Sequence, residues 1–311
     1  MKEIKKILLA IGGKPQKQEL VAEVCAVAQN AAAQVTLLSV FDAPSGNRKM
    51  DVEPMDLRQW MTEDRLELMT DISSGLVENG IQVTMKQAYG KPYLEIIREA
   101  LSGDYDLIMK PAESETAIKE VLFGSTDMQL FRACPYPVWA FKPTPNLKLR
   151  KVMVAVDLLK NDQEKNALAD KVLQWGKDVT DSVGAELHVI HIWSLYGEHT
   201  LRGRSILSHK VEQMVEDEKQ TQLQLLNQAL ARNDLKRENV QMHFIKGEAK
   251  ELIPATARLV QADLLIMGTV GRTGIPGFFI GNTAESVLRQ VSCSVLAIKP
   301  DGFISPVKLE A

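Results

Sequence analysis

The sequence predicts an α/β fold in which parallel strands alternate with helices that cover both faces of each sheet. Short apolar runs, typical of strands buried on both faces, alternate with longer segments of helical periodicity. The same order of runs then occurs a second time, and 311 residues are enough for two domains of ordinary size. We therefore expect two similar α/β domains in tandem.

A constant spacing between matching residues supports a tandem duplication. Residues 131–143 resemble residues 288–300, and Arg132 and Arg289 lie 157 positions apart. The same spacing separates Gly90 from Gly247 and Gly124 from Gly281. Prolines near residues 143–146 mark a linker between the halves. The expected domains are residues 1–143 and residues 150–311.

The first half alternates apolar runs with helical segments. Its strands are expected at residues 7–11, 35–40, 82–88, 107–109 and 138–141. Its helices are expected at residues 18–33, 56–79, 92–101 and 125–132. Leu20, Val24 and Val27 share one face of the first of these helices. Pro92 stands in the first turn of the third helix, where proline is tolerated.

The second half repeats this order. Its strands are expected at residues 152–156, 187–192, 240–245, 264–267 and 295–298. Its helices are expected at residues 162–183, 209–233, 250–260 and 284–289. Because apolar strands alternate with helices throughout, we expect right-handed crossovers between parallel neighbours.

The stretch of residues 268–283 is the strongest candidate for a binding loop. It follows an apolar strand, and Gly268 and Gly271 have no Cβ that would keep a ligand from the backbone. Unpaired N–H groups at the next helix start, near Gly281, Asn282 and Thr283, can hold a phosphate. The alternative is a glycine-rich turn with no ligand.

The spacing of these glycines resembles the nucleotide loop of the universal stress protein family. Gly268, Gly271 and Gly281 are separated by two and nine residues, and a polar residue follows the last. The family usually has Ser or Thr at that position, whereas this chain has Asn282, with Thr283 next. The resemblance covers nearly the whole chain. It implies two Rossmann-like domains of the adenine-nucleotide-binding type, each a five-stranded parallel sheet of order 3-2-1-4-5.

This strand order implies a ligand crevice between the first and fourth strands, where the winding direction reverses. Asp157 ends the first strand of the second half, and Gly268 follows the fourth. By resemblance, ATP or a related adenine nucleotide such as AMP would bind there, with Mg²⁺ on its phosphates. The implied contacts are Asp157 and Ile192 near the base or ribose, then Met267, Gly268, Val270 and Gly271, and finally Gly281, Asn282 and Thr283 at the phosphates.

The first half departs from the family pattern. Gly12 stands where Asp157 stands in the second half. Aligning Met109 with Met267 places Lys110 opposite Gly268 and Glu113 opposite Gly271. Side chains and acidic groups would crowd and repel a phosphate in such a loop. We therefore expect the first domain to be a degenerate copy that binds no nucleotide.

Other chemistry is sparse in the sequence. His188 and His191 lie on one predicted strand, and we interpret them as a strand pair rather than a metal site. No nucleophile–base pair can be proposed from spacing, so we predict no catalytic residues. Two alternatives remain open: a slow ATP hydrolase, and a carrier or scaffold for an apolar small molecule or lipid.

Composition limits the class of protein. A net charge of −3 does not favour nucleic-acid binding, and no apolar stretch approaches the roughly 20 residues that span a bilayer. Cys25, Cys134 and Cys293 have no CxxC spacing and are expected to be reduced thiols in the cytoplasm. The resemblance to the universal stress protein family implies a cytoplasmic stress-response protein, whose protein partners are unknown. By resemblance, residues 138–141 and 295–298 would pair to form an intramolecular pseudo-dimer, with a further homodimer as an alternative.

Overall fold

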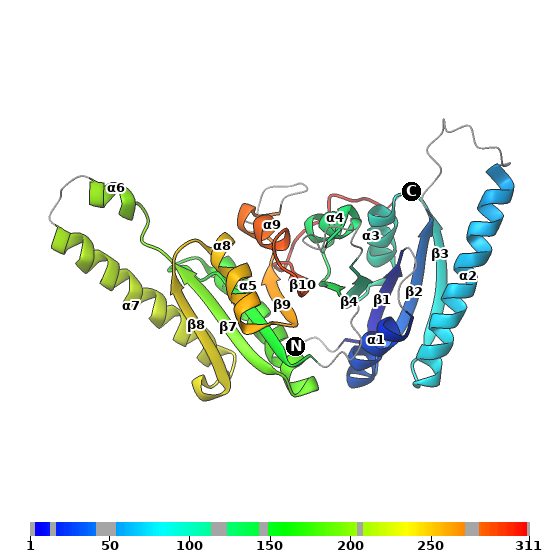
Figure 1. Cartoon of the computed structure of the whole chain (residues 1–311), viewed down its shortest axis with the longest axis horizontal. Helices are drawn as coiled ribbons and strands as arrows, with labels where there is room; N and C mark the ends of the chain where they lie inside the picture. The colour runs from blue at the N-terminus through cyan, green and yellow to red at the C-terminus, as the bar shows by residue number, and fades with distance from the viewer. Residues whose placement is uncertain are drawn as a thin grey trace. The chain divides into compact units, whose positions relative to one another are not determined.

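The chain forms two α/β units (Figure 1). The computed structural model describes residues 4–12, 17–41, 54–112, 123–142, 149–203, 208–270 and 280–309. The N-terminal unit consists of Lys2–Lys148 together with Ser305–Ala311, and the C-terminal unit consists of Leu149–Ile304. The last residues of the chain group with the N-terminal unit, where the Ser305 hydroxyl donates to the Ala133 carbonyl at 2.8 Å.

Each unit contains a parallel sheet with the predicted order 3-2-1-4-5. In the N-terminal unit the strands are β1 (Lys6–Ile11), β2 (Gln34–Phe41), β3 (Val83–Tyr89), β4 (Leu107–Pro111) and β5 (Val138–Phe141), in the order β3-β2-β1-β4-β5. In the C-terminal unit they are β6 (Lys151–Val156), β7 (Glu186–Trp193), β8 (Val240–Lys246), β9 (Leu264–Gly268) and β10 (Ser294–Ile298), in the order β8-β7-β6-β9-β10. The predicted fold class is confirmed.

The helices follow the predicted alternation with strands. The N-terminal unit has α1 (Lys17–Ala31), α2 (Pro54–Glu78), α3 (Pro92–Gly103) and α4 (Ser125–Ala133). The C-terminal unit has α5 (Gln163–Val183), α6 (Glu198–Gly203), α7 (Ser208–Arg232), η1 (Arg237–Asn239), α8 (Ala249–Val260) and α9 (Asn282–Leu288). The short helix α6 has no counterpart in the predicted elements. Within the described ranges, no helix has the length and apolar character needed to cross a membrane.

Burial explains why helices must lie on both sides of each sheet. All residues of β1 from Ile7 to Ile11 are buried, although successive side chains point to opposite faces. In the N-terminal unit α1 packs against α2 and α3 packs against α4, and in the C-terminal unit α5 packs against α7 and α8 against α9. The edge strands are less covered: most side chains of β3 are exposed, and in β8 only Val240 is buried.

A carboxylate fixes the start of the first strand in both units. Asp106 Oδ2, just before β4, accepts from the backbone N–H groups of Lys5 and Lys6 at 2.8 and 3.1 Å. Asp263 Oδ2, just before β9, accepts from Arg150 and Lys151 at 2.7 and 2.9 Å. The same contact at the same place in both sheets supports an internal duplication.

Strand pairing corrects one detail of the predicted alignment between the halves. Lys110 pairs with Ala140 of β5, whereas Met267 pairs with Ala297 of β10. Because Ala140 and Ala297 are themselves 157 positions apart, Lys110 corresponds to Met267 and not to Gly268. The alignment of Met109 with Met267 was wrong by one residue. The same alignment placed Glu113 opposite Gly271, and Glu113 lies outside the described residues.

Glu23 of α1 is a carboxylic acid inside the N-terminal unit. Its side chain is 1% exposed, and neither oxygen has a hydrogen-bond partner in the part of the chain that the structure describes. Burial raises its pKa from 4.5 to about 8, since a charged carboxylate loses its hydration there. The folded protein therefore keeps this proton over a pH range in which the unfolded chain has lost it.

We expect Glu23→Gln to remove a pH dependence of stability. In wild type the free energy of unfolding should fall as pH rises from about 5 to 8, by at most roughly 1.4 kcal/mol per pH unit, because only the unfolded state loses the proton in this window. Urea unfolding of both proteins at pH 5, 6.5 and 8 measures this. The advantage of Glu23→Gln over wild type should grow with pH, and a difference independent of pH would contradict the prediction.

Candidate functional site

The carboxyl ends of β6, β7 and β9 meet at one edge of the C-terminal sheet. Asp157 directly follows β6, Ile192 is the penultimate residue of β7, and Gly268 ends β9. The pairing of β6 with β9 and with β7 brings these chain segments together. The sequence therefore predicted correctly that residues distant in the chain share one edge of this sheet.

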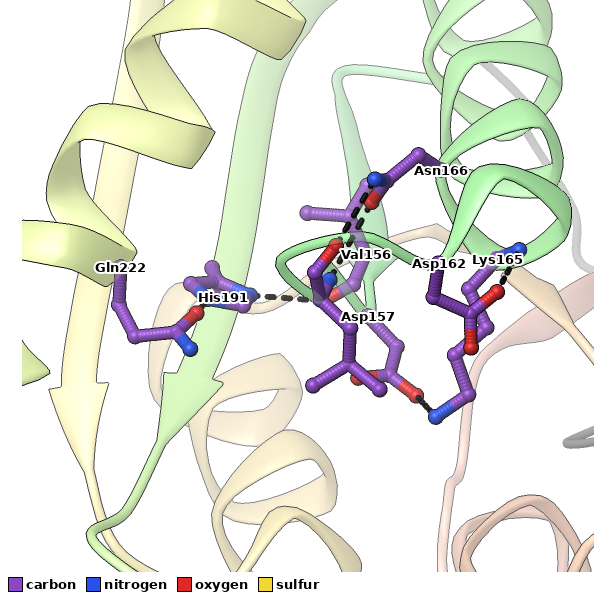
Figure 2. Close-up of polar contacts among 8 residues, drawn as sticks. Val156, Asp157, Asp162, Lys165, Asn166, His191 and Gln222 are labelled. Atoms are coloured by element: carbon purple, nitrogen blue, oxygen red, sulfur yellow. Dashed lines mark hydrogen bonds and ion pairs between the residues drawn. The ribbon is translucent and has the colours of Figure 1, made fainter.

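Asp157 is held by a lysine from the first turn of α5. The Lys165 ammonium lies 2.7 Å from Asp157 Oδ2 (Figure 2). The Asp157 side chain remains 70% exposed. An exposed pair of this kind contributes little to stability. Its effect on the site is to fix one carboxylate oxygen while leaving the group accessible to a hydrogen-bond donor.

The loop between β6 and α5 is fixed by local side-chain contacts. Asp162 caps α5, because its Oδ1 accepts from the Lys165 backbone N–H at 3.0 Å (Figure 2). Asn166 forms a reciprocal pair with Leu159, donating to its carbonyl at 2.9 Å and accepting from its N–H at 3.2 Å. This loop positions Asp157 and Lys165 relative to each other.

His191 connects the end of β6 to α7. Its Nδ1 donates to the Val156 carbonyl at 3.1 Å, since a carbonyl only accepts. Its Nε2 lies 2.8 Å from Gln222 Oε1 (Figure 2), and the Gln222 amide in turn donates to Glu218 at 2.8 Å. His191 is 1% exposed. It therefore supports the backbone next to Asp157 from inside the unit and does not itself line an open surface.

The neighbouring His188 forms a different contact. Its Nδ1 lies 2.9 Å from Nε2 of His243 on β8, and the two rings are stacked. Burial lowers the pKa of both imidazoles, and for His243 the charge of His188 lowers its pKa further. No group of three or more His, Cys, Asp or Glu side chains suited to a metal ion occurs among the described residues.

The start of α9 is anchored to the ends of β9 and β10 through Thr269. The Thr269 carbonyl accepts from the Gly281 N–H at 3.0 Å, and its N–H donates to the Ile298 carbonyl at 3.2 Å. The buried Lys299 ammonium donates to the Thr269 hydroxyl at 2.7 Å. These bonds fix the helix start beside the end of β9 through residues on either side of 271–279, which lie outside the described residues.

The first turn of α9 presents backbone donors without a side-chain acceptor. Gly281 is the N-cap residue, with extended dihedral angles (φ −64°, ψ 143°) and no side-chain cap. The next residues, Asn282 and Thr283, are exposed, whereas Ala284 is buried. The first N–H groups of a helix have no intrahelical partner, so this turn can hydrogen-bond an anion.

Gly268 has a packing role that the sequence did not indicate. A Cβ at this position would lie 2.7 Å from Cδ2 of Leu168 on α5. The absence of a side chain therefore allows α5 to pack against the end of β9. From the sequence, Gly268 was explained only by the access it gives a ligand to the backbone, without this contact.

The remaining predicted residues occupy this edge with different degrees of exposure. Met267 is 4% exposed, and Ile192, Val270 and Gly281 are partly exposed. Gly271 lies outside the described residues. Sequence reasoning missed Lys165, Gln222 and Thr269, which support the site. The sequence marks Asp162 as the N-cap of α5, but it gives no signal for the contact of Lys165 with Asp157.

The sequence is similar to proteins of one known family over most of its length. A sequence model described as the universal stress protein family matches residues 3–142 and 148–299. Universal stress protein E of Escherichia coli K12 is 32% identical over 272 residues, which cover 82% of this chain and 80% of that protein. The protein of the same name from Salmonella typhi is 30% identical over 274 residues, with the same coverage.

Solved structures with a similar fold cover nearly the whole chain. A functionally unknown protein from Pseudomonas aeruginosa PAO1 has a TM-score of 0.70 and 27% identity, covering 96% of this chain and 93% of that one. A universal stress protein from Archaeoglobus fulgidus has a TM-score of 0.67 at 21% identity, covering 94% and 98% respectively, and shows a shared fold.

We expect Gly268→Val to destabilise the protein through its contact with Leu168. Overpacking costs about 1–3 kcal/mol in a well-packed core, and the loss should lie at the low end of this range because the partly exposed Leu168 side chain can move. Truncating that side chain in Gly268→Val/Leu168→Ala should recover part of the loss. Urea unfolding of the two single variants and the double variant gives the coupling energy. Strictly additive effects would mean that the valine does not meet Leu168.

Proposed function

Because the chain belongs to the universal stress protein family, we propose that it is a cytoplasmic regulatory protein whose C-terminal unit binds ATP or a related adenine nucleotide. The observation that carries this proposal is the first turn of α9. Its donors lack a side-chain cap and lie at the sheet edge that also holds Asp157. An anionic group and a hydroxyl-bearing group could therefore be bound together.

The two ends of the nucleotide would contact different parts of this edge. The phosphates would accept from the backbone of Asn282 and Thr283 beside Gly281, where the helix dipole favours negative charge. The ribose or base would lie towards Asp157 and Ile192, with Met267, Gly268, Val270 and Gly271 between the two ends. Mg²⁺ would enter with the nucleotide, held by the phosphates and its own waters.

We propose binding without turnover. Hydrolysis needs a positioned water and a base or metal within hydrogen-bond reach, and Asp157 is paired with Lys165 at the end assigned to the nucleoside. Phosphate release from ATP under multiple-turnover conditions tests this point. Turnover near 1 s⁻¹, within the usual range of enzymes, would make the protein an ATP hydrolase instead.

The first experiment is to identify what the purified protein carries and how much it binds. Nucleotide released on denaturation, and one ATP bound per chain in calorimetry, would support the proposal. Release of an apolar molecule and no response to nucleotide would instead favour a carrier. Two equivalent ATP sites per chain would contradict assignment of the site to the C-terminal unit alone.

We expect Asn282→Pro to weaken ATP binding while leaving adenosine binding unchanged. Proline is well tolerated at the first position of a helix, and the extended conformation of Gly281 suits a residue before proline. The substitution removes one N–H donor to a charged phosphate, which is worth about 1.5–3 kcal/mol, or roughly tenfold to a hundredfold in Kd. Calorimetry with both ligands measures the difference.

Two variants control for other effects of this substitution. Asn282→Ala keeps the N–H and removes the amide side chain, so it should retain most of the affinity for ATP. Ser125→Pro makes the matching change at the first residue of α4 in the N-terminal unit and should leave ATP binding unchanged. Equal losses for ATP and adenosine in Asn282→Pro would show that the phosphates do not bind at α9.

A further inference from the structure

A buried ion pair lies at the start of α4 in the N-terminal unit. The Lys110 ammonium is 3.0 Å from Asp127 Oδ1, and the two side chains are 3% and 1% exposed. The same ammonium donates to the Pro111 carbonyl at 3.1 Å. Lys110 comes from β4 and Asp127 from the first turn of α4, so the pair connects the end of a strand to the beginning of a helix.

The Asp127 carboxylate lies at the start of α4, a place where the backbone of a helix can bind an anion. Its Oδ2 accepts from the backbone N–H of Gly124, the N-cap residue, at 3.1 Å. A negative group at this point is favoured by the helix dipole and by unpaired backbone donors. A bound phosphate oxygen needs a backbone donor and a nearby cation. Here both of these groups are already paired with the Asp127 carboxylate.

The equivalent positions in the C-terminal unit carry no charge, and the Gly281 N–H, the counterpart of the Gly124 N–H, donates to the Thr269 carbonyl at 3.0 Å. Strand pairing makes Met267 the counterpart of Lys110. Helix position makes Ala284 the counterpart of Asp127, because each is the third residue of a helix that follows an N-cap glycine, Gly124 or Gly281. One unit thus combines lysine with aspartate where the other combines methionine with alanine.

We propose that Asp127 is an internal substitute for a ligand anion. The residue at the third helical position, Asp127 or Ala284, then determines which unit accepts a phosphate. The part that concerns α9 rests on the proposed nucleotide binding of the C-terminal unit. The part that concerns α4 is independent of it, because it follows from the contacts of Lys110, Asp127 and Gly124. The N-terminal unit is closed to phosphate by its own side chain, and not only by the loss of loop glycines.

The first experiment removes the Asp127 carboxylate from the start of α4. Asp127→Ala leaves the Lys110 ammonium and the Gly124 N–H without their carboxylate, so a small anion should replace it. We expect the Tm of this variant to rise as gluconate, which is large and weakly binding, is replaced by chloride or inorganic phosphate at constant ionic strength. Wild type should respond less. A Tm response equal to that of wild type would overturn the proposal.

A matched double variant tests whether Lys110 provides the charge. Lys110→Met/Asp127→Ala reproduces the Met267 and Ala284 combination and should fold without an anion-dependent Tm. If Asp127→Ala alone is unfolded in gluconate, refolding on addition of phosphate supports the proposal, and failure of both anions to restore folding contradicts it. An anion response of the same size in the double variant would also contradict it, because the site would not require the lysine.

The second experiment closes the α9 position. Ala284→Asp should weaken ATP binding at least tenfold, and Ala284→Asn, similar in size but uncharged, should weaken it less. Met267→Lys/Ala284→Asp supplies the counter-charge should the single variant fold poorly, and it should not bind ATP either. Retained ATP affinity in a folded Ala284→Asp protein would refute the role of this position. If wild type binds no ATP, the proposed function fails, while the anion response of Asp127→Ala still decides the role of Asp127.

Discussion

The parallel pairing of the first and fourth strands is the constraint on which each unit depends. In the C-terminal unit it joins β6 to β9, so that Lys151 and Asp263, 112 positions apart in the chain, are hydrogen-bonded at 2.9 Å. Because the strands run in the same direction, their carboxyl ends fall at one edge. Asp157, Gly268 and the start of α9 are brought to this edge by backbone pairing, and the local side-chain contacts only refine their positions.

The fold could be predicted from the sequence because burial dictates its pattern. Strands covered on both faces must be apolar at successive positions, and the chain contains such runs at the same places in both halves. The correspondence between the halves could not be read from residue identity alone. Met109 and Met267 are both methionine, but the register of the strands is set by backbone hydrogen bonds. In this register Lys110 of the first half corresponds to Met267 of the second. The pair Asp106 and Asp263, 157 positions apart, was the sequence signal that would have fixed it.

The candidate site could be predicted only in part, because its supporting contacts are tertiary. A residue that ends a strand, such as Asp157, can be located from the apolar pattern. Its partner Lys165, the contact of His191 with Gln222 and the approach of Leu168 to Gly268 join helices to strand ends. The side chains that meet there depend on the angle and register of the helices, which periodicity does not specify.

The two units illustrate two solutions to one physical requirement. The N–H groups that open a helix need acceptors, and a helix that begins at the edge of a parallel sheet cannot obtain them from its own backbone. In the N-terminal unit a carboxylate from the helix itself accepts from the N-cap residue, and a lysine neutralises it. A buried ion pair contributes little net stability, but removal of one partner leaves the other charge buried without a counter-charge. Loss of Asp127 alone is therefore costly unless an anion replaces it. In the C-terminal unit the Gly281 N–H donates to the Thr269 carbonyl, and the uncharged pair Met267 and Ala284 places no carboxylate beside the N–H groups of Asn282 and Thr283. We therefore propose that the two units differ in ligand binding through a pair of coupled positions, and that both must change for one unit to acquire the character of the other without loss of stability.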